Sequence, residues 1–326
     1  MKLLVTGGSG FIGSNFVRYM LNKHSHYRVV NVDLLTYAGN QDNLTDIQQS
    51  EHYRFVRADI ADLNAMESLI GEGFDAIVNF AAESHVDRSI SNPGIFVQTN
   101  VTGTQVLLDL ARKYQVKKYI QVSTDEVYGT LGVEGLFSEK TPLAPNSPYS
   151  ASKAGADLLV RAYHETYGMN VNITRCSNNY GPYQFPEKLI PLMIRNALAD
   201  QTLPVYGDGQ NVRDWLHVED HCSAIDLVLH QGRSGEVYNV GGNNERTNMQ
   251  VVRTVLNELG KPESLISYVE DRLGHDRRYA IDATKIREEL GWTPKYNYET
   301  GIRQTVAWYR ANGEWMRRIE TGAYRQ

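Results

Sequence analysis

The sequence predicts an α/β protein built on a doubly wound parallel sheet, and two patterns carry this prediction. Short β-rich runs alternate with helix-like stretches through the first half of the 326-residue chain. The β-rich runs are apolar almost without interruption, which is typical of strands that are covered on both faces. Alternation of this kind implies right-handed crossovers between parallel strands, with helices on both sides of one sheet.

The expected elements follow from the apolar pattern along the chain. Strands are expected at residues 2–6, 27–33, 53–59, 75–81, 118–123 and 170–175. Helices are expected at residues 11–23, 62–70, 95–114 and 149–167.

The regular alternation of strands and helices ends after residue 175, where several prolines indicate a loop-rich region. A helix at about 220–230 and a strand at 236–240 are expected to return to the large sheet. We therefore expect residues 1–185 and about 213–245 in the larger domain. Residues from about 186 to 212 and 246–326 are expected to form a smaller C-terminal lobe that is interleaved with it.

Composition and charge exclude several classes of protein. A net charge of −5 argues against a nucleic-acid surface, which needs an excess of Lys and Arg. No apolar run approaches the roughly 20 residues that span a bilayer, and no signal-peptide pattern follows Met1. The two cysteines, Cys176 and Cys222, are far apart, so no disulfide framework, zinc pattern or other metal site is expected. A reducing, cytoplasmic setting is the default expectation.

A glycine-rich turn, Gly-Gly-Ser-Gly-Phe-Ile-Gly at residues 7–13, directly follows the first strand. Glycine permits a tight turn and a close approach to a pyrophosphate, and the next helix offers its unpaired N–H groups to the phosphates. Asp33 lies about 20 residues beyond Gly13, where a carboxylate accepts hydrogen bonds from an adenine ribose. Its charge would repel the 2′-phosphate of NADP, so we predict a Rossmann-like NAD site. The alternative is a solvated Asp at a strand end.

Tyr149 and Lys153 are spaced so that both side chains lie on one face of a helix. A nearby ammonium favours phenolate over phenol, so we expect the pKa of Tyr149 to fall from about 10 toward neutrality. Tyr149 would then be a usable base for a sugar hydroxyl. The same spacing recurs in two pairs that are interpreted as ordinary helix-surface residues, Tyr19/Lys23 and Tyr114/Lys118.

Thr124 ends the fifth expected strand, and active sites of doubly wound sheets lie beyond the carboxyl ends of the strands. Thr124 can therefore meet Tyr149. Asp125 and Glu126 come next, and one interpretation is a charged loop without chemistry. The other is an acid and a base with pKa values pushed apart, which elimination of water requires and simple oxidation does not.

These motifs together resemble the extended short-chain dehydrogenase/reductase superfamily and, within it, the dTDP-glucose 4,6-dehydratases. The resemblance is carried by residues 7–13, by Ser-Thr-Asp-Glu-Val-Tyr-Gly at 123–129 and by Tyr149-x-x-x-Lys153. Further matching segments lie at 33–40, 82–88, 175–182, 186–191, 209–215 and 271–278, so nearly the whole chain is covered. One departure is Leu273, where the family pattern has proline.

The resemblance implies a three-step cycle on a tightly held NAD. Tyr149 takes the proton of the 4-hydroxyl while hydride leaves C4, Lys153 holds the cofactor ribose, and Thr124 hydrogen-bonds the 4-oxygen. Glu126 then removes the C5 proton, and protonated Asp125 donates to the departing 6-hydroxyl. Hydride returns to C6 and gives dTDP-4-keto-6-deoxyglucose. The implied setting is deoxysugar biosynthesis, with dTDP-rhamnose as the expected pathway.

The implied contacts form three sets. The cofactor set is Gly7, Gly10, Phe11, Ile12, Gly13, Asp33, Leu34, Thr36, Asp59, Ile60, Ala81, Ala82, Thr99, Tyr149, Lys153 and Asn178. The substrate set is Ser84, Thr124, Asp125, Glu126, Asn178, Glu187, Lys188, Leu189, Pro204, Tyr206, Arg213, Asn248, Arg272 and His275. Helices 95–114 and 149–167 are expected to form a homodimer contact, although such apolar helices could equally be buried within one subunit.

Three alternatives stay open. A sugar-nucleotide 4-epimerase shares the NAD site and Tyr-x-x-x-Lys but needs no acid–base pair for C5 and C6, so Asp125 and Glu126 favour the dehydratase. A dehydratase of another nucleotide sugar, such as UDP-glucose, differs only in pocket shape. A catalytically silent NAD-binding regulator would have no physical need for all five reactive residues.

Overall fold

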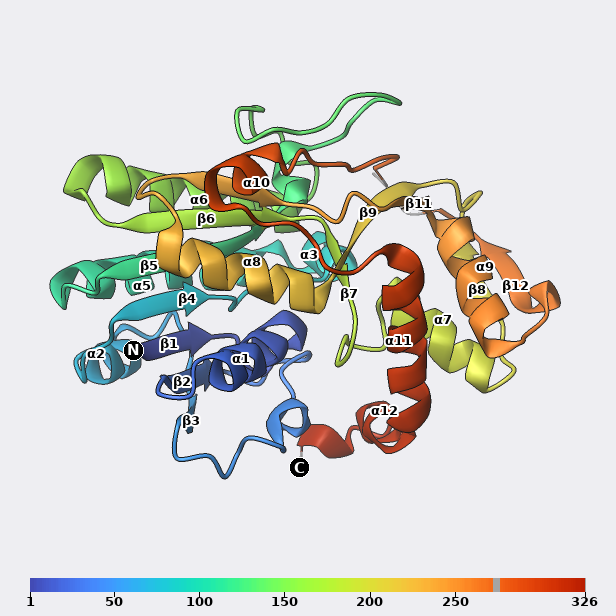
Figure 1. The fold of residues 1–326 in the computed structure, drawn as a ribbon, viewed down its shortest axis with the longest axis horizontal. Helices are drawn as coiled ribbons and strands as arrows, with labels where there is room; N and C mark the ends of the chain where they lie inside the picture. The colour runs from blue at the N-terminus through green and yellow to red at the C-terminus, as the bar shows by residue number, and fades with distance from the viewer. Residues whose placement is uncertain (272–275, 326) are drawn as a thin grey trace.

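A computed structural model describes residues 1–271 and 276–325. Seven strands form its central sheet: β1 (Lys2–Thr6), β2 (Arg28–Asp33), β3 (Tyr53–Arg57), β4 (Ala76–Asn79), β5 (Lys118–Thr124), β6 (Val171–Cys176) and β10 (Val237–Val240). Their order is β3–β2–β1–β4–β5–β6–β10, and all neighbours run parallel (Figure 1). The order reverses between β1 and β4, which is where such sheets bind ligands.

Helices cover both faces of this sheet, as the doubly wound prediction requires. One face carries α1 (Phe11–Lys23), α8 (Val218–Gln231) and α10 (Thr284–Leu290), and its core joins Phe16, Ile225 and Ile286 to Val5 and Ile120. The other face carries α2 (Leu63–Ile70), α5 (Gly103–Lys113) and α6 (Pro148–Tyr167), with Met66, Leu107 and Val160 in its core. The predicted fold class is confirmed.

The predicted helix over 95–114 is confirmed: α4 (Pro93–Phe96), a π-helical stretch η2 (Val97–Thr102) and α5 follow one another without a break. A separate short helix, α3 (Val86–Ser91), precedes it and was not predicted. Buried Asn100 lies in η2, where its amide nitrogen donates to the Glu83 carbonyl (3.0 Å) and the Ser152 hydroxyl (2.8 Å). Its amide oxygen accepts from the Glu83 N–H (2.9 Å). A π turn is frequent where a helix must aim one side chain at a functional site.

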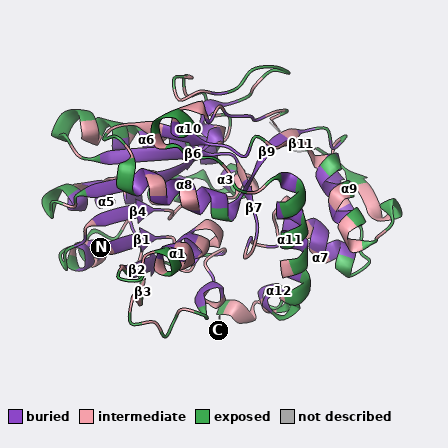
Figure 2. Cartoon of the chain, in the orientation of Figure 1, coloured by how far each residue is buried: buried purple, intermediate pink, exposed green. Residues whose placement is uncertain are grey.

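The C-terminal part contains two small sheets and four helices. The elements are β7 (Asn178–Tyr180), α7 (Leu189–Leu198), β8 (Leu203–Tyr206), β9 (Val212–His217), β11 (Glu245–Thr247), α9 (Asn248–Leu259), η4 (Glu263–Leu265), β12 (Ile266–Val269), α11 (Tyr298–Ala311), α12 (Gly313–Glu320) and η5 (Ala323–Arg325). Strands β11–β9–β7 form one sheet and β12–β8 the other. A separate core forms here around Tyr180, Trp215, Val252 and Val306 (buried residues are purple in Figure 2).

The C-terminal lobe and the sheet domain exchange segments. As predicted, residues 218–231 form a helix on the large sheet, and β10 pairs with β6. Ala283, Ile286 and Trp292, which were expected in the smaller lobe, pack in the core of the large sheet. The domain boundaries stay a prediction, and the lobes are joined more closely than it supposed.

The end of the chain returns to the N-terminal region. The Trp315 indole N–H donates to the Asn43 side chain (2.8 Å), which lies in η1 (Gln41–Leu44). The Tyr324 hydroxyl donates to the backbone carbonyl of Tyr37 (2.6 Å). The last residues therefore support the loop between β2 and η1. None of the described helices has both the length and the apolar character that a membrane crossing requires.

Candidate active site

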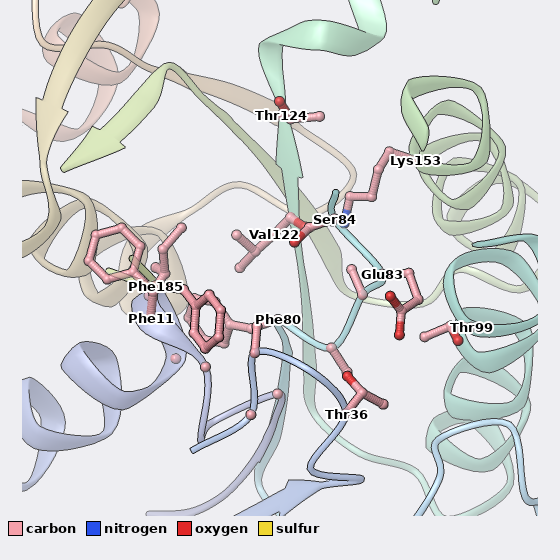
Figure 3. A pocket seen from close by; sticks show the side chains of 18 of the residues that line it. Phe11, Thr36, Phe80, Glu83, Ser84, Thr99, Val122, Thr124, Lys153 and Phe185 are labelled. Carbon is pink, nitrogen blue, oxygen red and sulfur yellow. Dashed lines mark hydrogen bonds between the residues drawn. The ribbon is translucent and has the colours of Figure 1, made fainter. Parts of the chain in front are cut away.

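One pocket opens beyond the carboxyl ends of β1, β2, β4 and β5, and the small lobe closes its other side through residues 177–179 and 184–188 (Figure 3). Every residue that the sequence assigned to the cofactor lines this pocket. Lys153 extends toward Val122 of β5, and Phe11, Phe80 and Phe185 lie across from it. The switch point of the sheet and the predicted cofactor residues therefore coincide.

The glycine turn lies between β1 and α1, and Gly7 and Gly13 are sterically required there. Gly7 has a φ of +69°, and a Cβ there would lie 2.5 Å from the Ala81 nitrogen. A Cβ on Gly13 would lie 2.2 Å from the Gly7 carbonyl oxygen. A Cβ on Gly10 would be 3.4 Å from the same oxygen, so this position is open toward the pocket. The turn thus packs α1 tightly and leaves N–H groups available for a pyrophosphate.

Asp33 ends β2 inside the pocket, with its carboxylate held by backbone donors. The Ser9 N–H (3.0 Å) and the Leu35 N–H (2.8 Å) each donate to one oxygen. Burial raises the pKa of Asp33, and these two hydrogen bonds oppose the rise. Each oxygen keeps a lone pair for a ribose hydroxyl. A glycine cradle, a helix N-terminus and an oriented carboxylate fit NAD.

Tyr149 and Lys153 come from the first turns of α6 and are both buried. A capping box of Ser147 and Ser150 fixes the start of this helix, with Pro148 at its first position. The Lys153 ammonium donates to the Val122 carbonyl (2.8 Å), which ties α6 to β5. The pair therefore has a fixed position at the edge of the sheet.

The predicted fall in the pKa of Tyr149 is wrong for this structure. Burial raises that pKa well above its usual value, the Glu126 charge raises it further, and a hydrogen bond with Thr124 opposes the rise. Burial also lowers the pKa of Lys153, which the Asp157 charge opposes. The spacing of Tyr149 and Lys153 indicates an ammonium near the phenol, but it does not reveal that burial removes both groups from water.

Asp125 and Glu126 begin a short 3₁₀ turn, η3 (Asp125–Tyr128), directly after β5. Asp125 is only 2% exposed, and its Oδ2 has no hydrogen-bond partner among the described residues. Burial raises the pKa of Asp125 well above its usual range, as do the charges of Glu126 and Asp214. The raised pKa of Asp125 favours its acid form, while Glu126 is half-buried in the same pocket. The two side chains therefore do not lie in a solvent-exposed loop.

Comparison with known proteins agrees with this chemistry. Residues 4–305 match the family model described as GDP-mannose 4,6 dehydratase. A dTDP-glucose 4,6-dehydratase of Xanthomonas campestris pv. campestris (strain B100) is 56% identical over 341 residues, covering 99% of this chain and 97% of the relative. The chain belongs to the dTDP-glucose 4,6-dehydratase family, within the extended short-chain dehydrogenase/reductases.

Solved structures separate this family from its relatives. A dTDP-glucose 4,6-dehydratase of Bacillus anthracis str. Ames, in complex with NAD, shares 57% identity and a TM-score of 0.93, covering 98% of this chain and 99% of that one. DesIV of Streptomyces venezuelae, with NAD bound, shares 52% identity and a TM-score of 0.95, with coverage of 98% and 100%. A UDP-glucose 4-epimerase of Thermotoga maritima is only 31% identical at a TM-score of 0.89, with coverage of 95% and 99%.

The substrate contacts that the resemblance implies for this family divide into three groups. Residues that line the pocket are Ser84, Thr124, Asp125, Glu126, Asn178, Glu187 and Lys188. The second group is described by the structure but does not line the pocket: Leu189, Pro204, Tyr206, Arg213 and Asn248. Arg272 and His275 lie outside the described residues. Of the second group, buried Arg213 acts on the site through its charge, which opposes the raised pKa of Asp125.

Tyr37, Arg88 and Asn100 are among the residues in or beside the pocket that were not predicted from the sequence. Tyr37 and Arg88 are in contact. Tyr37 lines the pocket, and the Arg88 guanidinium carbon lies 3.9 Å from its ring centroid. Both belong to segments that match the family, which was the available signal. Asn100 fixes the Glu83 backbone beside Ser84, and no signal in the sequence singles it out among the other polar residues of this helix.

Two other groups of residues lie apart from the pocket. His24, Asp226 and His230 bring ligand-type atoms together, but the Lys23 ammonium already pairs with Asp226 (2.8 Å), so we assign no metal there. Lys118, interpreted as a helix-surface residue, is instead buried in β5 and donates to the Gly232 carbonyl (2.9 Å). Burial lowers its pKa to about 8.

Proposed function

We propose that the protein is a dTDP-glucose 4,6-dehydratase, converting dTDP-glucose to dTDP-4-keto-6-deoxyglucose and water with NAD as its resident cofactor. One observation carries the proposal: a buried Asp125, whose pKa is raised by burial, and a neighbouring Glu126 share a pocket with Tyr149 and Lys153. An acid and a base beside a redox centre are what elimination requires. The family relatives bear the same name.

Different residues of the pocket would bind different parts of NAD. When bound, NAD supplies the redox chemistry, taking a hydride from the sugar C4 and returning it to C6. The turn from Gly7 to Gly13 would face the pyrophosphate, and Asp33 would accept from the adenine ribose. Asp59, fixed by the Ala61 N–H (2.9 Å), lies where it would meet the adenine.

The first chemical task is removal of the 4-hydroxyl proton, which we assign to Tyr149. Thr124 hydrogen-bonds the phenol and would orient the sugar oxygen. Because burial opposes the phenolate, Tyr149 needs a cation nearby to act as a base near neutral pH. The Lys153 ammonium is that cation, which makes its charge state decisive for this step.

The second task is elimination across C5 and C6. A ketone at C4 makes the C5 proton acidic, and Glu126 is placed to take it. Hydroxide is a poor leaving group, so Asp125 donates a proton to the departing 6-hydroxyl. The burial that raises the pKa of Asp125 thus suits this residue to donate a proton. Glu126 later returns the proton to C5.

The smaller lobe would bind the nucleotide. A diphosphate needs positive charge, and Lys188 lines the pocket while Arg213 lies behind Asp125. We propose both as nucleotide contacts, with Arg272 and His275 added from the resemblance. Leu189, Pro204, Tyr206 and Asn248 would join them by closure of this lobe on the substrate.

Incubation of the purified protein with dTDP-glucose in deuterated water, without added cofactor, tests the function. We expect NMR to show a 6-deoxy-4-keto sugar that carries deuterium at C5, because Glu126 exchanges its proton with solvent before returning it. UDP-glucose serves as the matched substrate and should react far more slowly. Formation of dTDP-galactose would indicate an epimerase instead, and unchanged substrate would indicate a silent NAD-binding protein.

We also propose a homodimer formed through α6 and the α3–η2 region. Ile90, Ile95, Val97 and Leu158 are each 42–56% exposed on these neighbouring elements, although they are large and apolar. A partner that covers them would remove this apolar surface from water.

Leu158→Glu should convert the dimer to a monomer, because two buried carboxylates would face each other across the contact. Light scattering should then give about 36.8 kDa instead of twice that mass. Leu63→Glu on α2, at a similarly exposed leucine outside the contact, is the control. A monomeric wild-type protein would contradict the proposal.

A cytoplasmic setting and a role in deoxysugar biosynthesis, with dTDP-rhamnose as the end product, complete the proposal. Cys176 and Cys222 are both buried thiols without a disulfide, as is usual in a reducing compartment. Recovery of the native protein in a periplasmic or secreted fraction would contradict this location.

A further inference from the structure

A buried ion pair lies directly behind the catalytic helix. The Arg175 Nε of β6 donates to Asp157 Oδ2 of α6 at 2.9 Å, and the two side chains are 6% and 1% exposed. Neither residue lines the pocket. Burying two charges is costly, and an apolar pair of similar volume would often stabilise a core equally well.

The carboxylate of this pair lies one helical turn beyond Lys153. Positions four apart share one face of a helix, so Asp157 and Lys153 are neighbours on α6. Burial lowers the pKa of Lys153, and the charge of Asp157 is the largest influence that opposes this effect. Asp157 Oδ1 has no hydrogen-bond partner among the described residues, so the ion pair with Arg175 leaves part of the carboxylate unused.

The guanidinium of this pair reaches the turn that carries the acid and the base. Arg175 Nη1 donates to the Tyr128 hydroxyl at 3.0 Å, and its guanidinium carbon lies 4.9 Å from the Tyr128 ring centroid. Tyr128 ends η3, the turn that Asp125 and Glu126 begin. The Tyr128 hydroxyl in turn donates to Asn239 of β10 at 2.8 Å. Arg175 therefore contacts both the helix of Tyr149 and Lys153 and the turn of Asp125 and Glu126.

We propose that Asp157 and Arg175 are positioning residues for the reaction: Asp157 keeps Lys153 in its ammonium form, and Arg175 fixes the catalytic helix relative to the turn that carries the acid and the base. The proposal rests on the proposed function, because it assigns Lys153 a charge that the first step needs. A purely structural ion pair would stabilise the fold without acting on the charge of Lys153.

Other titratable groups around Lys153 have to be considered with Asp157. Cys176 on β6 faces it, but burial raises the pKa of that thiol to about 12, so it stays neutral through the working range. Burial and the Glu126 and Asp214 charges raise the pKa of Asp125. Among the described residues, the other charged groups that act on the Tyr149–Lys153 pair are Glu126 from η3 and Asp157 from α6, and Arg175 of β6 is paired with Asp157.

The test compares the pH dependence of dTDP-glucose turnover in two variants of the same ion pair. Loss of the Lys153 proton should set the alkaline limb of the profile. Asp157→Asn removes the opposing negative charge, so this limb should move down by about one pH unit or more. Arg175→Gln removes the positive charge that is paired with Asp157. The Asp157 carboxylate then stabilises the Lys153 ammonium more strongly, so the alkaline limb should move to higher pH. Both variants break the same contact, and only an electrostatic role moves the limbs in opposite directions.

Asp109→Asn is the matched control, because Asp109 of α5 accepts from Tyr163 of α6 (2.7 Å) but is not among the groups that act on Lys153. Its profile should equal that of wild type. The proposal would be overturned if the alkaline limb lay at the same pH in wild type and in both ion-pair variants. It would also be overturned if the limb moved in the same direction in both variants. If neither variant folds, the wild-type profile decides: an alkaline limb below about pH 8 would mean that burial alone governs Lys153. Absence of wild-type turnover would instead refute the proposed function.

Discussion

Asp125→Asn should slow the release of water by about 10²–10⁴-fold, the contribution typical of a positioned proton donor. Asparagine matches the volume of the protonated carboxyl but has no acidic proton for the departing 6-hydroxyl. The earlier steps should persist, because Tyr149, Lys153 and Glu126 are unchanged. In deuterated water, NMR should therefore show dTDP-glucose recovered with deuterium at C5 and little 6-deoxy product.

Glu126→Gln provides the contrast. Without this base the C5 proton is not removed, so recovered dTDP-glucose should carry no deuterium, although NAD stays bound. Burial and the Glu126 and Asp214 charges raise the pKa of Asp125, which favours the acid form that proton donation needs. Full turnover by Asp125→Asn would assign proton donation to another group.

Tyr149→Phe should abolish the reaction at its first step, with a loss of about 10²–10⁴-fold in turnover. Phenylalanine fills the same space but cannot take the 4-hydroxyl proton. Without a C4 ketone the C5 proton is not acidic, so neither deuterium exchange nor product should appear by NMR. NAD should remain bound in amounts equal to wild type, because the glycine turn and Asp33 are untouched.

The chain contains its own control for this substitution. Tyr19 and Lys23 on α1 have the same spacing, and the Lys23 ammonium donates to the Tyr19 hydroxyl at 3.1 Å. Tyr19 does not line the pocket, so Tyr19→Phe should leave turnover unchanged. Deuterium at C5 in Tyr149→Phe would show that another base opens the reaction.

Local pattern was sufficient to predict the sheet and the cofactor side of the pocket. Each strand is a short apolar run between turns, and the glycine turn lies where chain direction and strand order require it. Most of the residues from Gly7 to Lys153 that were expected to meet NAD lie at strand ends, in the loops that follow them or near helix starts, and parallel strands bring such positions to one edge of the sheet. Their convergence therefore follows from sequence order.

The properties that could not be predicted depend on contacts between distant segments. The raised pKa of Tyr149 comes from burial by several elements, which the spacing to Lys153 does not encode. The π-helical stretch within the helix over 95–114 contains Asn100, whose contacts with Glu83 and Ser152 join segments far apart in the sequence. The positions of Arg213 and Asn248 depend on how the smaller lobe packs, and its short polar segments carry little periodicity.

The hydrogen bond from Tyr324 to the Tyr37 carbonyl has a consequence for synthesis of the protein. A ribosome makes the chain from its N-terminus, so the glycine turn and Asp33 emerge long before the residue that supports the neighbouring loop. Tyr324 is therefore synthesised long after the glycine turn and Asp33. A nascent chain can assemble most of its sheet early, but this rim of the pocket is completed only when Tyr324 has left the ribosome.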